Sequence, residues 1–163
     1  MSSDTLNDHG KDQFKPNTTV AAVVTYKDRF LLVEEIENGR EVLNQPAGHI
    51  EANESLIAAA KRELKEETGL SLSPDYLSGI YYFQRKDLDL HFLRFCFVFN
   101  IEETSAPVCK PEDDEIINCH WLTLEEIKQN EGKLRSAMVL ECIEDYLSGQ
   151  RVPLSVIKSN LST

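Results

Sequence analysis

Three glutamates crowd onto one face of a predicted helix between residues 48 and 70 of this chain. The segment reads GHIEANESLIAAAKRELKEETGL, and Glu63, Glu66 and Glu67 are three and four residues apart within it. Such spacings place side chains on the same side of an α-helix, and this side borders the helix's own apolar stripe. Like charges so placed repel by about 0.2–0.5 kcal/mol per pair, and partial burial adds to this cost. The fold must therefore supply a positive partner.

A bound divalent cation is the simplest source of that positive charge. Lys61 and Lys65 lie on the opposite side of the predicted helix, and only Arg62, four residues before Glu66, is placed to pair within it. Carboxylate oxygens are the ligands that hard divalent cations prefer in proteins. The helix therefore predicts a site for Mg²⁺, with Mn²⁺ as a substitute.

A longer motif surrounds the glutamates. It consists of a glycine, five residues, a glutamate, seven residues, an Arg-Glu-aliphatic-x-Glu-Glu core, one residue and a closing Gly-aliphatic pair. The matching residues are Gly48, Glu54, Arg62, Glu63, Leu64, Glu66, Glu67, Gly69 and Leu70. With the residue type fixed at seven positions, a chance match at a given start has a probability of about one in 10⁸. The segment resembles the Nudix box, the signature of hydrolases that split diphosphates linked to another moiety.

The resemblance implies an α+β (α/β) fold, the Nudix αβα sandwich with a mixed central sheet, in which the box forms a loop-helix-loop. It also implies the metal ligands. These are the carboxylates of Glu63 and Glu67 and the backbone carbonyl of Gly48, with Glu66 as a further ligand or a water-positioning group. Arg62 is implied to hold the carboxylates in orientation. The box therefore predicts both the metal site and the catalytic residues.

The catalytic base stays open between two glutamates. Members of this family do not always take the base from the box, because some use a glutamate from a distant loop. Glu63 is the first expectation, and Glu115, at the end of a long acidic loop, is the second. Glu112, Asp113 and Asp114 before it rank behind Glu115 as candidates, and the favoured alternative for them is a solvated charge run. Glu54 is expected to brace the loop at the start of the helix rather than to bind metal.

Short stretches outside the box extend the resemblance over most of the chain: 14–16, 44–49, 92–95 and 148–151. They are similar to phosphatases of this family that remove orthophosphate from nucleoside tri- and diphosphates and act on thiamine diphosphate and its hydroxymethylpyrimidine diphosphate precursor. Asn44, His49 and Arg94 are the expected substrate contacts. Two alternatives stay open: His49 caps its turn instead, and Arg94 pairs with a nearby glutamate instead.

Size and charge limit the partners of this chain. Its 163 residues are enough for one domain, expected over 16–155 and preceded by a flexible tail over 1–15. A net charge of −11 disfavours nucleic acid and anionic membranes, and leaves small phosphorylated metabolites as partners of the expected monomer or small homo-oligomer. The polar N-terminus and four scattered cysteines predict a cytoplasmic protein.

Hydrophobic patterns predict strands on both sides of the central helix. The helix is expected to begin near Asn53, a good N-cap, and to end at Gly69. Two further helices are expected over 123–129 and 134–147. The expected strands cover 18–26, 29–36, 42–45, 77–84, 91–101 and 116–122. This order predicts an α+β or α/β sandwich with a mixed sheet.

The expected function is metal-dependent hydrolysis of phosphoanhydride bonds in small di- and triphosphate compounds, with release of orthophosphate. A divalent metal assists because it acidifies bound water and neutralises the diphosphate. One alternative is a pyrophosphohydrolase of nucleoside triphosphates or nucleotide sugars, which releases pyrophosphate or monophosphates. Two others are a catalytically silent Nudix domain that binds a nucleotide and a metal-stabilised structural domain.

Overall fold

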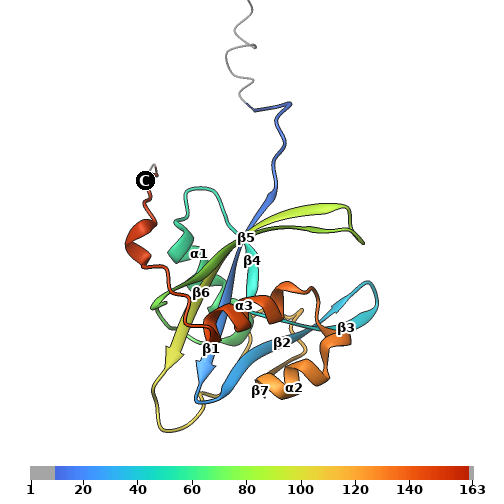
Figure 1. Ribbon diagram of the computed structural model, residues 1–163, viewed down its shortest axis with the longest axis vertical. Helices are drawn as coiled ribbons and strands as arrows, with labels where there is room; N and C mark the ends of the chain where they lie inside the picture. Colours follow the sequence, from blue (N-terminus) through green and yellow to red (C-terminus); the bar gives the residue numbers. More distant parts are fainter. Residues whose placement is uncertain (1–9, 162–163) are drawn as a thin grey trace, which may run out of the picture.

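A mixed seven-stranded sheet forms the centre of the computed structural model, which describes residues 10–161 (Figure 1). Its strands are β1 (Asn17–Tyr26), β2 (Arg29–Glu37), β3 (Arg40–Asn44), β4 (Ala47–His49), β5 (Tyr76–Arg85), β6 (Leu90–Ile101) and β7 (Asn118–Thr123). The main path runs β3-β2-β1-β6-β5, while β4 pairs with β1 and β7 pairs with β2. Among the seven strands of residues 10–161, the β1–β6 pair is the only parallel one, which confirms the expected mixed sheet.

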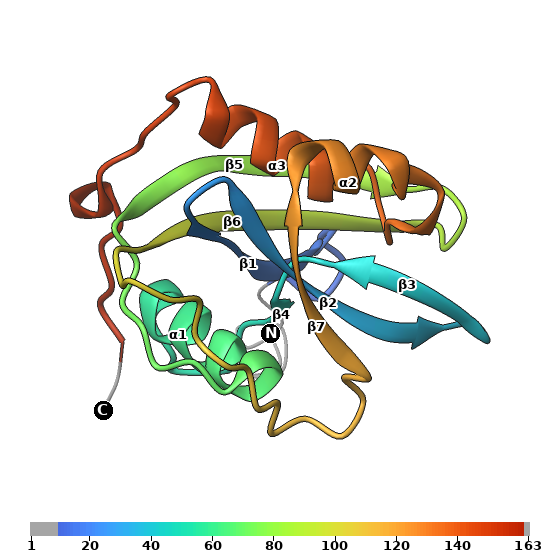
Figure 2. The same cartoon turned by 90° about the horizontal axis from the view of Figure 1, so that it is seen from below.

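Helices cover both faces of this sheet. The helix α1 (Leu56–Thr68) packs on one face, whereas α2 (Leu124–Gln129) and α3 (Met138–Leu147) pack on the other (Figure 2). Two 3-10 turns, η2 (Glu131–Lys133) and η3 (Leu154–Val156), lie on either side of α3 in the chain. Alternate residues of β1 enter the two apolar clusters, which is why the strand is buried on both sides. The result is the αβα sandwich that the resemblance implied.

The strands β1 and β2 separate soon after their connecting turn. Their paired residues are confined to the turn end, where Thr25 lies opposite Phe30 and Tyr26 opposite Arg29. Farther along β1, the short strand β4 takes the neighbouring place, and its Gly48 lies opposite Val20. The first residue of the box therefore lies beside the central strand of the sheet.

The predicted start of α1 is wrong by two residues, whereas its predicted end is confirmed. The N-cap is Ser55, whose Oγ accepts a hydrogen bond from the backbone N–H of Ala58 at 3.1 Å. Asn53 lies in the turn before the helix with φ +61°, so it cannot cap. Gly69 ends the helix in the left-handed region at φ +78° and donates to the carbonyl of Lys65.

The last helix also begins later than predicted, at Met138 instead of residue 134. The preceding segment pairs with β3, because the N–H of Arg135 donates to the carbonyl of Leu43 at 2.9 Å and Leu134 forms a bridge with Leu43. This pairing keeps the chain extended there. It brings Arg135 to a cavity that Glu67 of α1 also lines.

The predicted tail is only partly covered by the structure, because residues 1–9 lie outside the described residues. From Gly10 onward the chain forms a turn, and the ring of Phe14 meets His91 edge-on at 5.0 Å. None of the helices within residues 10–161 is long and apolar enough to cross a membrane.

Candidate active site

The three glutamates of α1 differ in how far they are exposed to solvent. Glu67 is 6% exposed, and the side chain of Glu63 is 14% exposed, whereas that of Glu66 is 47% exposed. The expectation that the carboxylates border the buried face is therefore confirmed for Glu63 and Glu67. Glu66 lies at the solvent side of the group.

Arg62 joins the carboxylates at the outer side of α1. Its guanidinium binds Glu54 through Nε at 2.6 Å and Nη2 at 3.0 Å, and Nη1 donates to Glu63 at 2.8 Å and to Glu66 at 3.2 Å. Nη2 also donates to the carbonyl of His49 at 3.0 Å. The hydrogen bond from Arg62 lowers the pKa of Glu54. Glu54 therefore braces the loop before the helix, as expected, and Arg62 forms the pair with Glu66 that the spacing predicted.

The Glu63 carboxylate occupies the space that a side chain at residue 48 would fill. A Cβ atom at residue 48 would overlap the carboxylate of Glu63, so any other residue type here would force that carboxylate to move. Burial raises the pKa of Glu63, and the hydrogen bond from Arg62 opposes this effect. The backbone of β4 and the Glu63 carboxylate are therefore in direct contact.

Glu67 is the most strongly perturbed carboxylate of the helix. Its Oε1 accepts one hydrogen bond, from the N–H of Ala47 at 2.8 Å. Burial raises the pKa of Glu67 to about 9, and the negative charges of Glu35, Glu63 and Asp113 add to the effect. A nearby cation would reverse this shift, because it favours the charged form.

This raised pKa predicts how the metal-free protein responds to pH. Between about pH 5 and pH 9 the folded state keeps a proton on Glu67 that the unfolded state has lost, so stability falls as pH rises. The slope reaches at most about 1.4 kcal/mol per pH unit for one proton. Urea unfolding in EDTA at pH 5.5, 7 and 8.5 measures it, with Glu67→Gln as the reference that cannot titrate. Parallel stability curves for the two proteins would contradict the prediction.

A cavity of about 210 Å³, here called the Glu67 pocket, opens beside these carboxylates. Three buried polar atoms of its lining residues have no hydrogen-bond partner within the described chain: Thr19 Oγ1, Asn44 Oδ1 and Arg94 Nε. Buried polar groups in folded proteins are almost always paired with protein, water or ligand. The pocket therefore offers hydrogen-bonding groups to a polar ligand.

The three expected substrate contacts all line the Glu67 pocket. Arg94 donates to Gln45 Oε1 at 3.2 Å and stacks on Phe83 at 5.4 Å, with no carboxylate of residues 10–161 at ion-pair distance. The alternative that Arg94 pairs with a glutamate is therefore wrong. The ring of His49 contacts Asn17 Oδ1 at 3.3 Å, which leaves its role open.

The acidic loop contributes to the same pocket. Glu115 lines it, as does Asp113, whose Oδ1 accepts from the N–H of Glu115 at 2.9 Å. The N–H groups of Glu112 and Asp113 both donate to the carbonyl of Glu66 at 2.8 Å, which ties the loop to the end of α1. The expectation of a solvated run is therefore wrong for Asp113, although Glu112 and Asp114 are exposed.

Several pocket residues were not predicted from the sequence: Thr19, Glu35, Phe83, Arg85, Phe92, Arg135 and Ser136. The strand period carries a signal for one of them, Phe92. Phe92 and Arg94 alternate along β6 and so share a face, and Thr19 lies opposite Arg94 in the β1–β6 pair. The pocket thus combines four carboxylates with three arginines, an arrangement suited to a cation and a polyanion together.

Comparison with known proteins agrees with this arrangement. Residues 15–141 match the NUDIX domain family. The chain is 46% identical to Phosphatase NudJ of Escherichia coli K12 over 144 residues, which cover 88% of this chain and 92% of that protein. This chain belongs to the Nudix hydrolase family. Its box is complete, and Nudix hydrolases use divalent metal ions.

Solved Nudix structures share the architecture. A NUDIX hydrolase from Nitrosomonas europaea is 41% identical, with a TM-score of 0.82, and the match covers 90% of this chain and 98% of that chain. The NUDIX domain of Shewanella oneidensis NrtR, solved with ADP ribose, is 20% identical with a TM-score of 0.73 over 91% and 99% of the two chains. At 20% identity, the similarity to the NrtR domain shows a shared fold only.

The Nudix box residues fit a divalent metal by their chemistry. Within residues 10–161 no three acidic, histidine or cysteine side chains already lie close enough together to hold a metal ion. Arg62 binds both Glu63 and Glu66. Among the described residues Glu67, in contrast, is a buried carboxylate without a cationic partner, and the Glu63 carboxylate lies against Gly48. Carboxylates are hard oxygen donors, as Mg²⁺ or Mn²⁺ requires, and Glu67 and Gly48 both line the pocket.

Proposed function

We propose that this Nudix hydrolase cleaves phosphoanhydride bonds in small di- and triphosphate compounds and releases orthophosphate, with Mg²⁺ as cofactor and Mn²⁺ as a substitute. The observation that carries the proposal is the buried Glu67 carboxylate, which has no cationic partner among the described residues and lines a pocket together with Arg94. Nucleoside tri- and diphosphates, thiamine diphosphate and hydroxymethylpyrimidine diphosphate are the proposed substrates. The 46% identity with a protein named as a phosphatase supports this choice.

The ligands proposed for the metal are the carboxylates of Glu63, Glu66 and Glu67 and the carbonyl of Gly48. A bound divalent metal neutralises the diphosphate and lowers the pKa of water. Arg62 orients Glu63 and Glu66 through hydrogen bonds of 2.8 and 3.2 Å. The N–H of Ala47 fixes the direction of the Glu67 carboxylate.

Substrate phosphates are proposed to contact Arg94, with Asn44 and His49 at the pocket wall. Arg94 is 7% exposed, and its Nε has no partner within the described residues, so the guanidinium keeps a free donor. A buried arginine with a free donor binds phosphate oxygens through charge-assisted hydrogen bonds. The ring of Phe83 holds the guanidinium plane in place.

Glu63 and Glu115 remain the two proposals for the general base that takes a proton from the attacking water. Burial raises the pKa of Glu63, which brings it closer to the range of an effective base at neutral pH. Glu115 lines the pocket from the opposite loop and lies on a segment that is tied to α1. General-base catalysis is worth about 10²–10⁴-fold in rate.

Product analysis tests the function and the base together. Nucleoside diphosphates, nucleoside triphosphates and thiamine diphosphate are incubated with Mg²⁺, and orthophosphate and pyrophosphate are measured separately. We expect orthophosphate as the main product, and a loss of about 10²-fold or more in Glu115→Gln if that residue is the base. Pyrophosphate as the main product would favour the pyrophosphohydrolase alternative. Nucleotide binding without turnover would favour a silent domain.

A further inference from the structure

A second cavity, here called the outer groove, continues from the Glu67 pocket. Its volume is about 480 Å³, and it lies between the β2–β3 turn, the β5–β6 turn and the segment before α3. Four residues line both cavities: Phe83, Arg85, Arg135 and Ser136. The two cavities therefore share a wall, along which a bound molecule can extend from one into the other.

The Glu67 pocket is too small to hold a complete nucleotide. Sites for small molecules and cofactors usually have volumes of about 300–1,000 Å³, and the Glu67 pocket has 210 Å³. A diphosphate with an attached nucleoside exceeds this space. The part of the substrate beyond the diphosphate must therefore lie outside the Glu67 pocket, and the shared wall leads into the outer groove.

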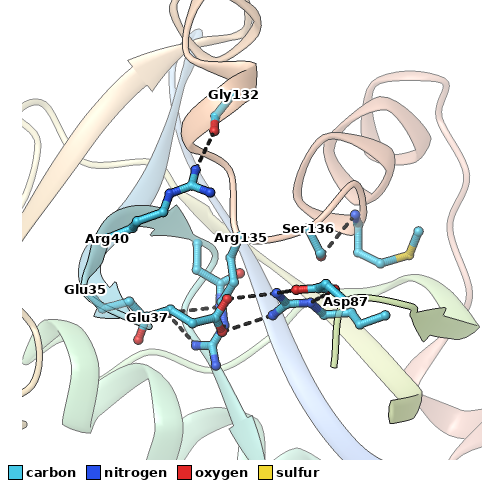
Figure 3. A network of polar contacts seen from close by, with 10 residues as sticks. Glu35, Glu37, Arg40, Asp87, Gly132, Arg135 and Ser136 are labelled. Atoms are coloured by element: carbon cyan, nitrogen blue, oxygen red, sulfur yellow. Dashed lines mark hydrogen bonds and ion pairs between the residues drawn. The ribbon is translucent and has the colours of Figure 1, made fainter. Parts of the chain in front are cut away.

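The two arginines of the shared wall are already neutralised. Arg85 binds Glu37 with two hydrogen bonds of 2.8 and 3.0 Å and binds Asp87 at 2.6 Å. Arg135 binds Glu37 at 2.6 Å and Glu35 at 2.7 Å (Figure 3). These pairs account for both carboxylates that line the outer groove.

Two further cations line the outer groove without a carboxylate partner in the described part of the chain, Arg40 and Lys86. Arg40 reaches away from the ion pairs toward the carbonyl of Gly132, at a long 3.4 Å (Figure 3). Both side chains are exposed. Arg40 and Lys86 thus add two positive charges to a network of two arginines and three carboxylates, on a chain whose net charge is −11. Such a local excess attracts an anion.

We propose that the outer groove binds a phosphate monoester that the substrate carries at a distance from the diphosphate. This inference rests on the proposed function, because the diphosphate must occupy the Glu67 pocket. A phosphate monoester has a charge of about −1.5 to −2 at pH 7, which matches the two free cations better than a carboxylate does. The substrate class is then a diphosphate compound with an additional phosphate on its organic part.

Matched nucleotides test the outer groove independently of turnover. Dissociation constants of ADP and of adenosine 3′-phosphate 5′-diphosphate are measured by calorimetry in EDTA. We expect the protein to bind the 3′-phosphorylated nucleotide about tenfold more tightly, because two charge-assisted contacts each contribute roughly a factor of three. In Arg40→Ala/Lys86→Ala this preference should fall to about one, with the affinity for ADP changed less than about twofold.

A charge-matched control variant is Lys11→Ala/Lys158→Ala, since both lysines are exposed and neither lines the cavity. It should keep the preference. Equal affinity of the unmodified protein for the two nucleotides would overturn the inference, as would an equal loss of preference in both double variants. Orthophosphate release from ADP in Mg²⁺ tests the proposed function separately. Release without any 3′-phosphate preference therefore rejects the groove alone, and a preference without release rejects the proposed function alone.

Discussion

Replacing Glu67 with glutamine is expected to lower orthophosphate release by about 10³-fold or more. A metal ligand that stabilises charge in the transition state is worth several kcal/mol, and each 1.4 kcal/mol is about tenfold in rate. The glutamine amide keeps the size of the side chain and an oxygen that accepts the N–H of Ala47. Initial rates with saturating Mg²⁺ measure the loss.

Two further measurements show whether this loss is specific to the site. Glu141→Gln makes the same chemical change at an exposed residue of α3 and should leave the rate unchanged. Glu66→Gln should cost less, about 10–100-fold, because this half-exposed carboxylate already pairs with Arg62. A folded Glu67→Gln protein with full activity would reject the proposed role of Glu67. Folding is checked by urea unfolding, where this variant should lose none of its stability at pH 8.5.

Replacing Arg62 with alanine is the second large expected effect. The change removes the cationic partner of the partly buried carboxylates of Glu54 and Glu63, which costs about 1–3 kcal/mol of folding free energy. The melting temperature should fall by roughly 3–10 °C for a chain of this size. The rate should fall by about 10–100-fold, because residues that orient metal ligands have effects of this size.

The response to metal distinguishes two roles for Arg62. If the guanidinium positions Glu63 and Glu66, the Mg²⁺ concentration for half-maximal activity rises in Arg62→Ala. Arg62→Lys should recover only part of the activity, because an ammonium group cannot bind three carboxylates in the fixed geometry of a guanidinium. Lys65→Ala, on an exposed part of the same helix, is the control. A lower Mg²⁺ requirement in Arg62→Ala would mean that the arginine competes with the cation.

The box helix was predictable because its properties are local. The helical repeat alone brings Glu63, Glu66 and Glu67 to one side and places Arg62 one turn before Glu66. Its start was not predictable in the same way, since Asn53 and Ser55 are both good caps. Ser55 caps because the residue between them, Glu54, must lie outside the helix to bind the guanidinium of Arg62.

The acidic loop shows where local patterns fail. A run of acidic residues predicts a solvated segment, because such charges are stable in water. In the structure the loop instead provides two N–H groups for the carbonyl of Glu66, and Asp113 turns into the pocket. The partner for this interaction is 46 or 47 residues away in the chain, so no short window of sequence contains it.

The amino-acid sequence by itself determined the family, the mixed-sheet sandwich and the three glutamates, because these depend on motif spacing and on periods of two and 3.6 residues. Only the tertiary structure decided which distant side chains complete the pocket. Thr19 and Arg94 meet through the β1–β6 pair, and Arg135 arrives because the chain before α3 pairs with β3. The physical reason is that strand pairing joins residues far apart in the chain, and the hydrogen bonds that set its register are not encoded in either strand alone.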